Sequence, residues 1–180
     1  DSVASRGLGD VYKRQAINRA ELNDVGFFGE GTPQQYIGFS PKPAFVSDKW
    51  MSHATEFDAA RANSLLDEIG MKDTDGDGFR ELPNGDKLVL NMSFATQGIA
   101  GQTVELVGQY WADVGVQSVV KEVTPDEFRS AQSANKLDVM MWRKSQPLAI
   151  VLGNNELWVP PFENYFGVRT GMLWAEWVDS

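Results

Sequence analysis

The chain has 180 residues, enough to bury a hydrophobic core, and its 42% hydrophobic and 23% charged residues are typical of a globular protein. The 16 lysines and arginines against 25 aspartates and glutamates give a net charge of −9, which argues against nucleic acid or an anionic membrane surface as a partner. The absence of cysteine excludes a disulfide scaffold and a thiolate metal site, the single histidine leaves no histidine cluster for zinc, and no apolar run approaches a membrane span.

The two ends of the chain differ from the rest. Residues 1–15 lack a hydrophobic period and resemble the translated linker sequence found at the edges of proteins predicted from fragmented environmental DNA. We expect them to be a non-native linker or a disordered arm without a function. Residues 173–178 begin an apolar element where the chain stops. Both ends indicate a fragment of a larger protein.

The first part of the chain predicts two helices separated by an irregular segment. Residues 16–25 predict a short helix, whereas residues 26–56 have no period and hold six aromatic side chains. These rings need a ligand or another part of the protein to pack against. Asp58 can cap the second helix, and Gly70 ends it. The apolar positions of that helix at helical spacing are Ala62, Leu65, Leu66 and Ile69.

The second part predicts strand, helix, strand, helix and strand between residues 87 and 142. Alternating residues 88–94 predict a strand with one buried face, residues 104–114 carry a helical stripe, and residues 116–123 are β-branched. Three helix-start signals follow: a capping Thr124, Pro125 at the first position, and Glu127 three residues after the cap. With a last apolar strand at residues 137–142, we predict an α/β fold, a mixed β-sheet with flanking helices joined by right-handed crossovers.

Alternate aspartates in residues 73–81 resemble the start of a calcium loop, in which such carboxylates converge on the ion. The position of the closing bidentate glutamate holds Asn84, and a strand follows instead of a helix, so an EF-hand is excluded. A weak calcium site on Asp73, Asp75 and Asp77, with Glu81 as a further ligand, stays open. We favour a solvated turn, since Asp and Gly supply the backbone angles of tight turns.

The last part of the chain is rich in aromatic rings, amides and a few charges. Flat apolar platforms with orienting polar groups suit a sugar or peptide site. Trp142 ends a predicted central strand, where ligands of open α/β sheets bind. The rings after Trp158 could equally pack against another lobe. The predicted ligand-binding residues are Trp142, Arg143, Ser145, Asn154 and Trp158.

Five segments in order resemble the peptide/nickel-type solute-binding proteins of ABC importers, known as family five. The first resembles that family's A-I-D-R-x-x-I-N … G-x-G-x-P pattern, and the third resembles its D-G-D-G-x-R turn. The segments are residues 16–33, 57–71, 75–80, 111–116 and 138–142.

The resemblance implies an incomplete, large C-terminal lobe of a periplasmic-binding-protein type II-like fold. Residues 16–146 would form the α/β lobe, and residues 147–180 would return towards a missing N-terminal lobe. It further implies an extracytoplasmic monomer, periplasmic or membrane-anchored, that captures a peptide or oligosaccharide and delivers it to a permease. Neither catalysis nor a resident cofactor is expected, calcium aside.

Ser145 departs from the family pattern. Peptide binders of the family commonly place an aspartate there, three residues after the tryptophan, to pair with the ligand's α-amino group. A peptide would lose that partner, so the solute stays open. Two other hypotheses remain: a freestanding calcium-binding structural or adhesive module built on Asp73–Glu81, and, least favoured, a carbohydrate-active enzyme.

Overall fold

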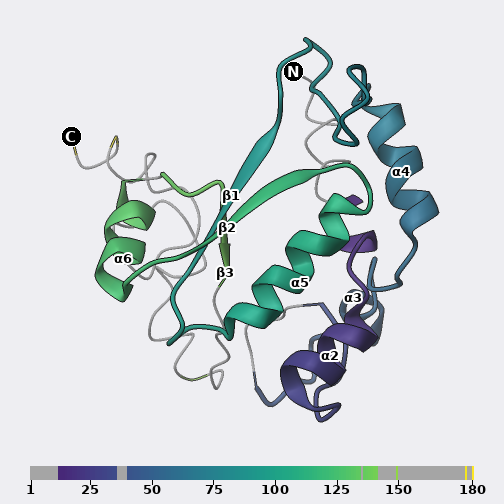
Figure 1. Ribbon diagram of the computed structural model, residues 1–180. Coiled ribbons are helices and arrows are strands. Elements are labelled where there is room, and N and C mark those ends of the chain that lie inside the picture. Colours follow the sequence, from purple (N-terminus) through teal and green to yellow (C-terminus); the bar gives the residue numbers. More distant parts are fainter. Residues whose placement is uncertain (1–11, 36–39, 135, 142–148, 150–176, 178–179) are drawn as a thin grey trace.

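The computed structural model describes residues 12–35, 40–134 and 136–141, together with residues 149, 177 and 180 (Figure 1). Within these ranges short helices precede a three-stranded sheet whose strands alternate with helices. No helix of the described part is both long and apolar enough to cross a membrane. The elements are α2 (Arg19–Phe27), α3 (Asp48–Met51), α4 (Ala59–Glu68), β1 (Val89–Phe94), α5 (Gly101–Ala112), β2 (Gln117–Glu122), α6 (Pro125–Ser133) and β3 (Val139–Met141).

The sheet has the strand order β2-β1-β3, and both described pairings are parallel. The register runs from Val89↔Gln117 to Phe94↔Glu122 on one side of β1, and Phe94 is also opposite Met141 of β3. Parallel pairing requires the crossover helices α5 and α6, so the alternation of strands and helices predicted from the sequence is confirmed.

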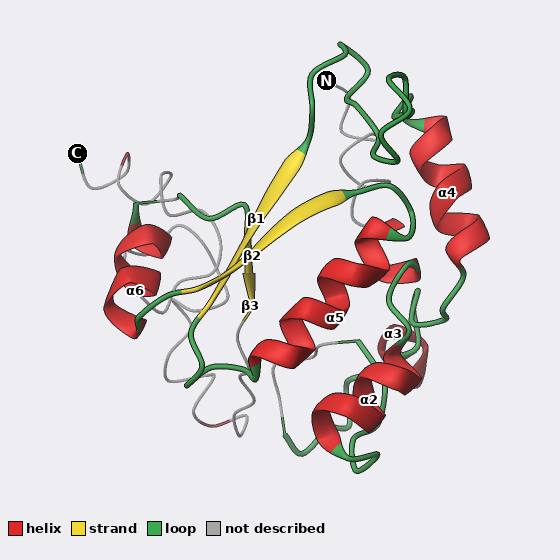
Figure 2. Cartoon of the chain, viewed as in Figure 1, coloured by secondary structure: helices red, strands yellow, loops and turns green. Residues whose placement is uncertain are grey.

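Helix α5 covers one face of the sheet and packs against α2 on its other side (Figure 2). The close approach depends on Gly108, because a Cβ atom there would lie 3.3 Å from both Ser118 Oγ and Val120 Cγ2. The face of the sheet towards α5 carries the buried Met92 and Phe94. The core joins this face to α4 and α5 through Ala62, Leu65, Leu66, Val104, Val107, Trp111, Val114 and Val116.

Local capping signals act as the sequence predicts. The Asp58 side chain accepts a hydrogen bond from the backbone N–H of Arg61 at 2.8 Å and begins α4. Thr124 and Glu127 form a reciprocal capping box at the start of α6. Gly70 has a φ of +82° just after α4, a backbone conformation that glycine adopts without strain. The irregular segment contains one element that periodicity missed, α3, which is only one turn long.

The structure differs from the predicted arm at residues 12–15, which form a helical turn packed into the core. Tyr12 is only 5% exposed, and Trp111 Nε1 donates a hydrogen bond to the carbonyl of Lys13 at 3.2 Å. Gln15 also accepts a hydrogen bond from the backbone of Asp58 at 2.9 Å. A disordered arm therefore does not extend to residue 15, while the non-native origin of residues 1–15 stays a prediction.

Candidate functional site

The carboxyl edge of the parallel sheet is the candidate ligand site. Because the strands are parallel and in register, Phe94, Glu122 and Met141 end β1, β2 and β3 at the same edge. Ligands of open α/β sheets bind outside this edge, where the loops that follow the strands converge. Trp142, the first of the predicted ligand-binding residues, follows Met141 in the sequence.

The described residues at this edge offer polar groups. Thr96, just after β1, donates a hydrogen bond to the carboxylate of Glu122 at the end of β2. Thr124 accepts a hydrogen bond from the backbone N–H of Glu127 at 3.2 Å and donates its own backbone N–H to Glu127 Oε2 at 2.9 Å. Hydrogen bonds from the backbone and the hydroxyl of Thr124 lower the pKa of Glu127. An edge of hydroxyls and carboxylates suits a neutral, hydroxyl-rich or amide-rich solute.

The five predicted ligand-binding residues fall outside the described part of the chain. Their roles therefore stay predictions that rest on the sequence and on the position of β3. The residues are Trp142, Arg143, Ser145, Asn154 and Trp158.

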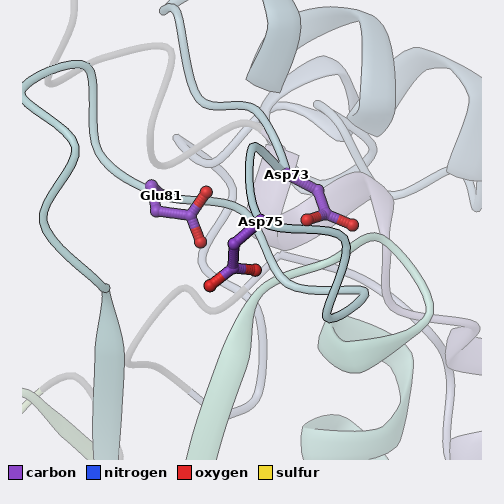
Figure 3. A group of neighbouring side chains, drawn as sticks. All are labelled: Asp73, Asp75 and Glu81. Carbon is purple, nitrogen blue, oxygen red and sulfur yellow. The ribbon is translucent and has the colours of Figure 1, made fainter.

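The aspartate-rich turn before β1 gathers three carboxylates (Figure 3). Oxygens of Asp73, Asp75 and Glu81 lie within 4.8 Å of one another. Asp77, which the sequence predicted as a ligand, is not in this group; it pairs instead with Lys87, whose Nζ lies 2.5 Å from Asp77 Oδ2. Glu81, the further candidate, joins the group because backbone bridges to Lys72 and Lys87 hold it inside the turn, where it is 5% exposed.

Hydrogen bonds within the turn use many of the carboxylate lone pairs. Both oxygens of Asp73 accept backbone N–H groups, from Gly76 at 2.7 Å and Gly78 at 3.0 Å. Glu81 Oε2 accepts from the backbone N–H and the hydroxyl of Thr74, at 2.8 and 2.6 Å. These are the local bonds by which aspartate and threonine stabilise tight turns.

Arg80, in the same turn, forms hydrogen bonds both to α4 and to the segment between α5 and β2, a role that the sequence did not predict. Its Nε donates to the carbonyl of Val114 at 3.1 Å, and its Nη1 donates to the carbonyl of Met71 at 2.7 Å. Nη1 also bonds Asp67 at 2.6 Å, and Nη2 bonds Asn63 at 2.9 Å. The turn thus connects α4 to the link between α5 and β2. The only sequence signal was the arginine of the D-G-D-G-x-R resemblance.

A second surface feature surrounds α2, which contains no buried residue. Phe27 is 49% exposed, and Phe28 is 86% exposed with a φ of 54°, an unusual conformation for a bulky side chain. Beside them lies a hollow of about 330 Å³, with Leu22, Phe27 and Pro33 among its lining residues. Helix α2 packs on α5 and the core through half-buried residues such as Leu22, and its last turn leaves the two phenylalanine rings exposed.

Arg19 lies at the base of this hollow and holds the preceding segment in place. Its Nη1 donates to the carbonyls of Arg14 at 2.8 Å and Thr55 at 3.2 Å. Burial lowers the pKa of the Arg19 guanidinium, and repulsion from Arg14 adds to the effect, while Glu56 opposes it. The arginine therefore connects the start of α2 to the end of the irregular segment.

An α/β lobe with a parallel sheet and a polar carboxyl edge is an architecture in which many proteins bind small ligands. The chain belongs to the bacterial extracellular solute-binding proteins, family 5: the family's Middle model matches residues 14–148. This match confirms the resemblance found in the sequence.

Three relatives illustrate the family. The chain is 26% identical over 158 residues to the periplasmic alpha-galactoside-binding protein of Rhizobium meliloti (strain 1021), covering 81% of this chain and 22% of that protein. The structure resembles an oligopeptide-binding protein OppA with a TM-score of 0.80 and 28% identity, covering 96% of this chain and 26% of that one. It shares the fold of MelB from Agrobacterium fabrum C58, solved in complex with stachyose, with a TM-score of 0.70 and 20% identity, covering 93% and 26%. The chain spans about a quarter of the length of these relatives.

Proposed function

We propose that this chain is part of the substrate-binding component of an ABC importer, which captures a peptide or an oligosaccharide and delivers it to a membrane permease. The observation that carries the proposal is the family match over residues 14–148, a range that includes all three parallel strands. The relatives named above are binding proteins, and binding without turnover is the role proposed here. The proposed location is the periplasm or the outer side of a membrane to which the protein is anchored.

Between the two solute classes we favour an oligosaccharide. Ser145 stands where the family's peptide binders commonly place an aspartate, so the α-amino group of a peptide would lack its charge partner. One relative is named for binding alpha-galactosides, and another was solved with stachyose, an α-galactosyl oligosaccharide. The 28% identity to an oligopeptide-binding protein makes peptides the competing class.

The proposed site is a cleft shared with a second lobe. The exposed rings of Phe27 and Phe28 at the end of α2 support a further lobe, because an aromatic surface of this kind is usually covered. Closure of the two lobes around the solute would be a population shift, driven by contacts that only the closed state makes.

The test begins with the DNA on both sides of the coding segment. We expect a continuous frame that adds a second lobe and an export signal, beside permease genes. The complete protein, titrated calorimetrically, is expected to bind stachyose and to bind an unmodified oligopeptide far more weakly. The 180-residue chain alone is expected to bind neither tightly, since it offers one wall of the cleft.

The results separate the parts of the proposal. Binding of the oligopeptide in preference to stachyose would overturn the choice of solute and leave the importer function intact. Micromolar binding of stachyose by the 180-residue chain alone would contradict the shared cleft. A frame that begins near Ala16 and ends after Ser180 would contradict the importer function itself.

A calcium-binding structural module is the second candidate, and the three gathered carboxylates of Asp73, Asp75 and Glu81 favour it. Its signature would be a rise in melting temperature with millimolar calcium that disappears in Asp75→Ala. No rise in the native chain would rule it out.

A further inference from the structure

The aspartate-rich turn already contains a cation that the chain itself supplies. Lys87 Nζ lies 2.9 Å from Asp75 Oδ2 and 2.5 Å from Asp77 Oδ2. Hydrogen bonds that Lys87 donates to Asp77 and Asp75 raise the pKa of Lys87. The same contact with Lys87 lowers the pKa of Asp77.

The position of this ammonium follows from backbone pairing. Glu81 forms antiparallel bridges with both Lys72 and Lys87, and the backbone N–H of Leu82 donates to the carbonyl of Asp86 at 2.8 Å. Lys87 therefore lies on the strand segment directly beside Glu81, and its side chain extends over the turn towards Asp75 and Asp77. The pairing that places Lys87 is the same pairing that fixes the turn.

The two aspartates that meet Lys87 occupy alternate positions of the turn. In a calcium loop, carboxylates at alternate positions turn towards one ion. Here Asp75 and Asp77 turn towards an ammonium, and Asp73 is occupied by two backbone N–H groups. The turn thus surrounds a cation, and this cation is the side-chain ammonium of Lys87.

We propose that the ammonium group of Lys87 is the resident cation of this turn and takes the place that a divalent ion has in a calcium loop. The turn is therefore closed without metal, and loss of the Lys87 charge frees Asp75 to bind calcium together with Asp73 and Glu81, whose oxygens lie within 4.8 Å of it. The consequence for the lobe is that the Arg80 contacts, which adjoin Glu81 in the chain, do not depend on the calcium concentration outside the cell. This proposal is independent of the solute.

The test compares three forms of the 180-residue chain: native, Lys87→Met, and Lys42→Met. Lys42 is the matched control because it forms an equally short ion pair elsewhere, 2.5 Å from Asp48 Oδ1. Melting temperatures are measured by circular dichroism in about 10 mM calcium and in the same concentration of magnesium, which binds such flexible oxygen sites poorly.

We expect no calcium effect on the native chain or on Lys42→Met. For Lys87→Met, a dissociation constant of about 1 mM, as in extracellular calcium modules, would raise the melting temperature by about 3–6 °C. Lys87→Gln removes the charge but keeps a hydrogen-bond donor, so it serves as the second variant and should respond alike. Lys87→Arg keeps the charge and should not respond.

A direct readout accompanies melting. The amide signals of Gly76 and Gly78, whose N–H groups bond to Asp73, are expected to shift with calcium in Lys87→Met and to stay unchanged in the native chain. A calcium response of the native chain as large as that of Lys87→Met would overturn the proposal, because Lys87 would not be competing with the ion. The absence of any response in both Lys87→Met and Lys87→Gln would overturn it equally.

Discussion

Replacing Arg80 with methionine removes the charged group that joins α4 to the link between α5 and β2. The Arg80 side chain is 15% exposed and donates to two backbone carbonyls, those of Val114 and Met71, and to the amide oxygen of Asn63. The bond to Asp67 adds little, because that carboxylate is 60% exposed and solvent screens the pair. A hydrogen bond to a charged group contributes about 1.5–3 kcal/mol, and such bonds are not additive within one group. We therefore expect Arg80→Met to lower the free energy of unfolding by about 3–4 kcal/mol.

Urea unfolding followed by tryptophan fluorescence measures this loss, with the free energy extrapolated to water. Arg61→Met is the matched control, since Arg61 is exposed on α4 and the substitution keeps the backbone N–H that donates to Asp58. The control is expected to change stability by less than about 0.5 kcal/mol. If Arg80→Met lost no more than the control, the reasoning that the turn fastens the lobe would be refuted.

Gly108→Val is expected to cost more than about 2 kcal/mol in urea unfolding, because its side chain would overlap Val120 and push α5 off the sheet. Phe28→Asn is expected to raise the melting temperature by a few degrees, about 2–4 °C, since asparagine tolerates the positive φ and an exposed ring is removed; a fall would mean that the ring is held by contacts. Thr124→Ala should lose about 1 kcal/mol of cap stability. The pKa of Glu127 is lower in the folded than in the unfolded chain. The Glu127 carboxylate therefore stabilises the fold at a pH above its unfolded pKa, and this stabilisation is lost as the pH falls through its folded pKa. The free energy of unfolding of Glu127→Gln should thus approach that of the native chain in acid.

Local signals in the sequence were sufficient for α4 and for the strands and helices from β1 to β3, because their causes lie within a few residues. The side chain of Asp58 caps its own helix, and Thr124 with Glu127 caps the next. Leu65 and Leu66 are buried where the helical period places them. The order of strands and helices then restricts the sheet to few topologies, and the parallel one is observed.

Contacts distant in sequence were not predictable in this way. Arg80 meets Val114 across 34 positions, and Trp111 meets Lys13 across 98. The packing of Tyr12 is of the same kind, since nothing in the composition of residues 1–15 indicates a core position. The acidic group contains Glu81 and not Asp77 because the backbone of Glu81 pairs with that of Lys87. No local sequence pattern predicts this pairing.

The location of the candidate ligand site and the choice of solute have different physical origins. Parallel pairing of β3 with β1 places Met141, the last residue of β3, at the edge where β1 and β2 also end, whatever side chains follow it. The solute is selected by groups presented at that edge, and a charged ligand terminus needs a partner of opposite charge there. In the proposed site, a substitution at Ser145 is expected to change which solute is bound without changing the register of the sheet. The described fold positions the carboxyl edge, and our proposal assigns the choice between a sugar and a peptide to side chains that follow β3 in the sequence.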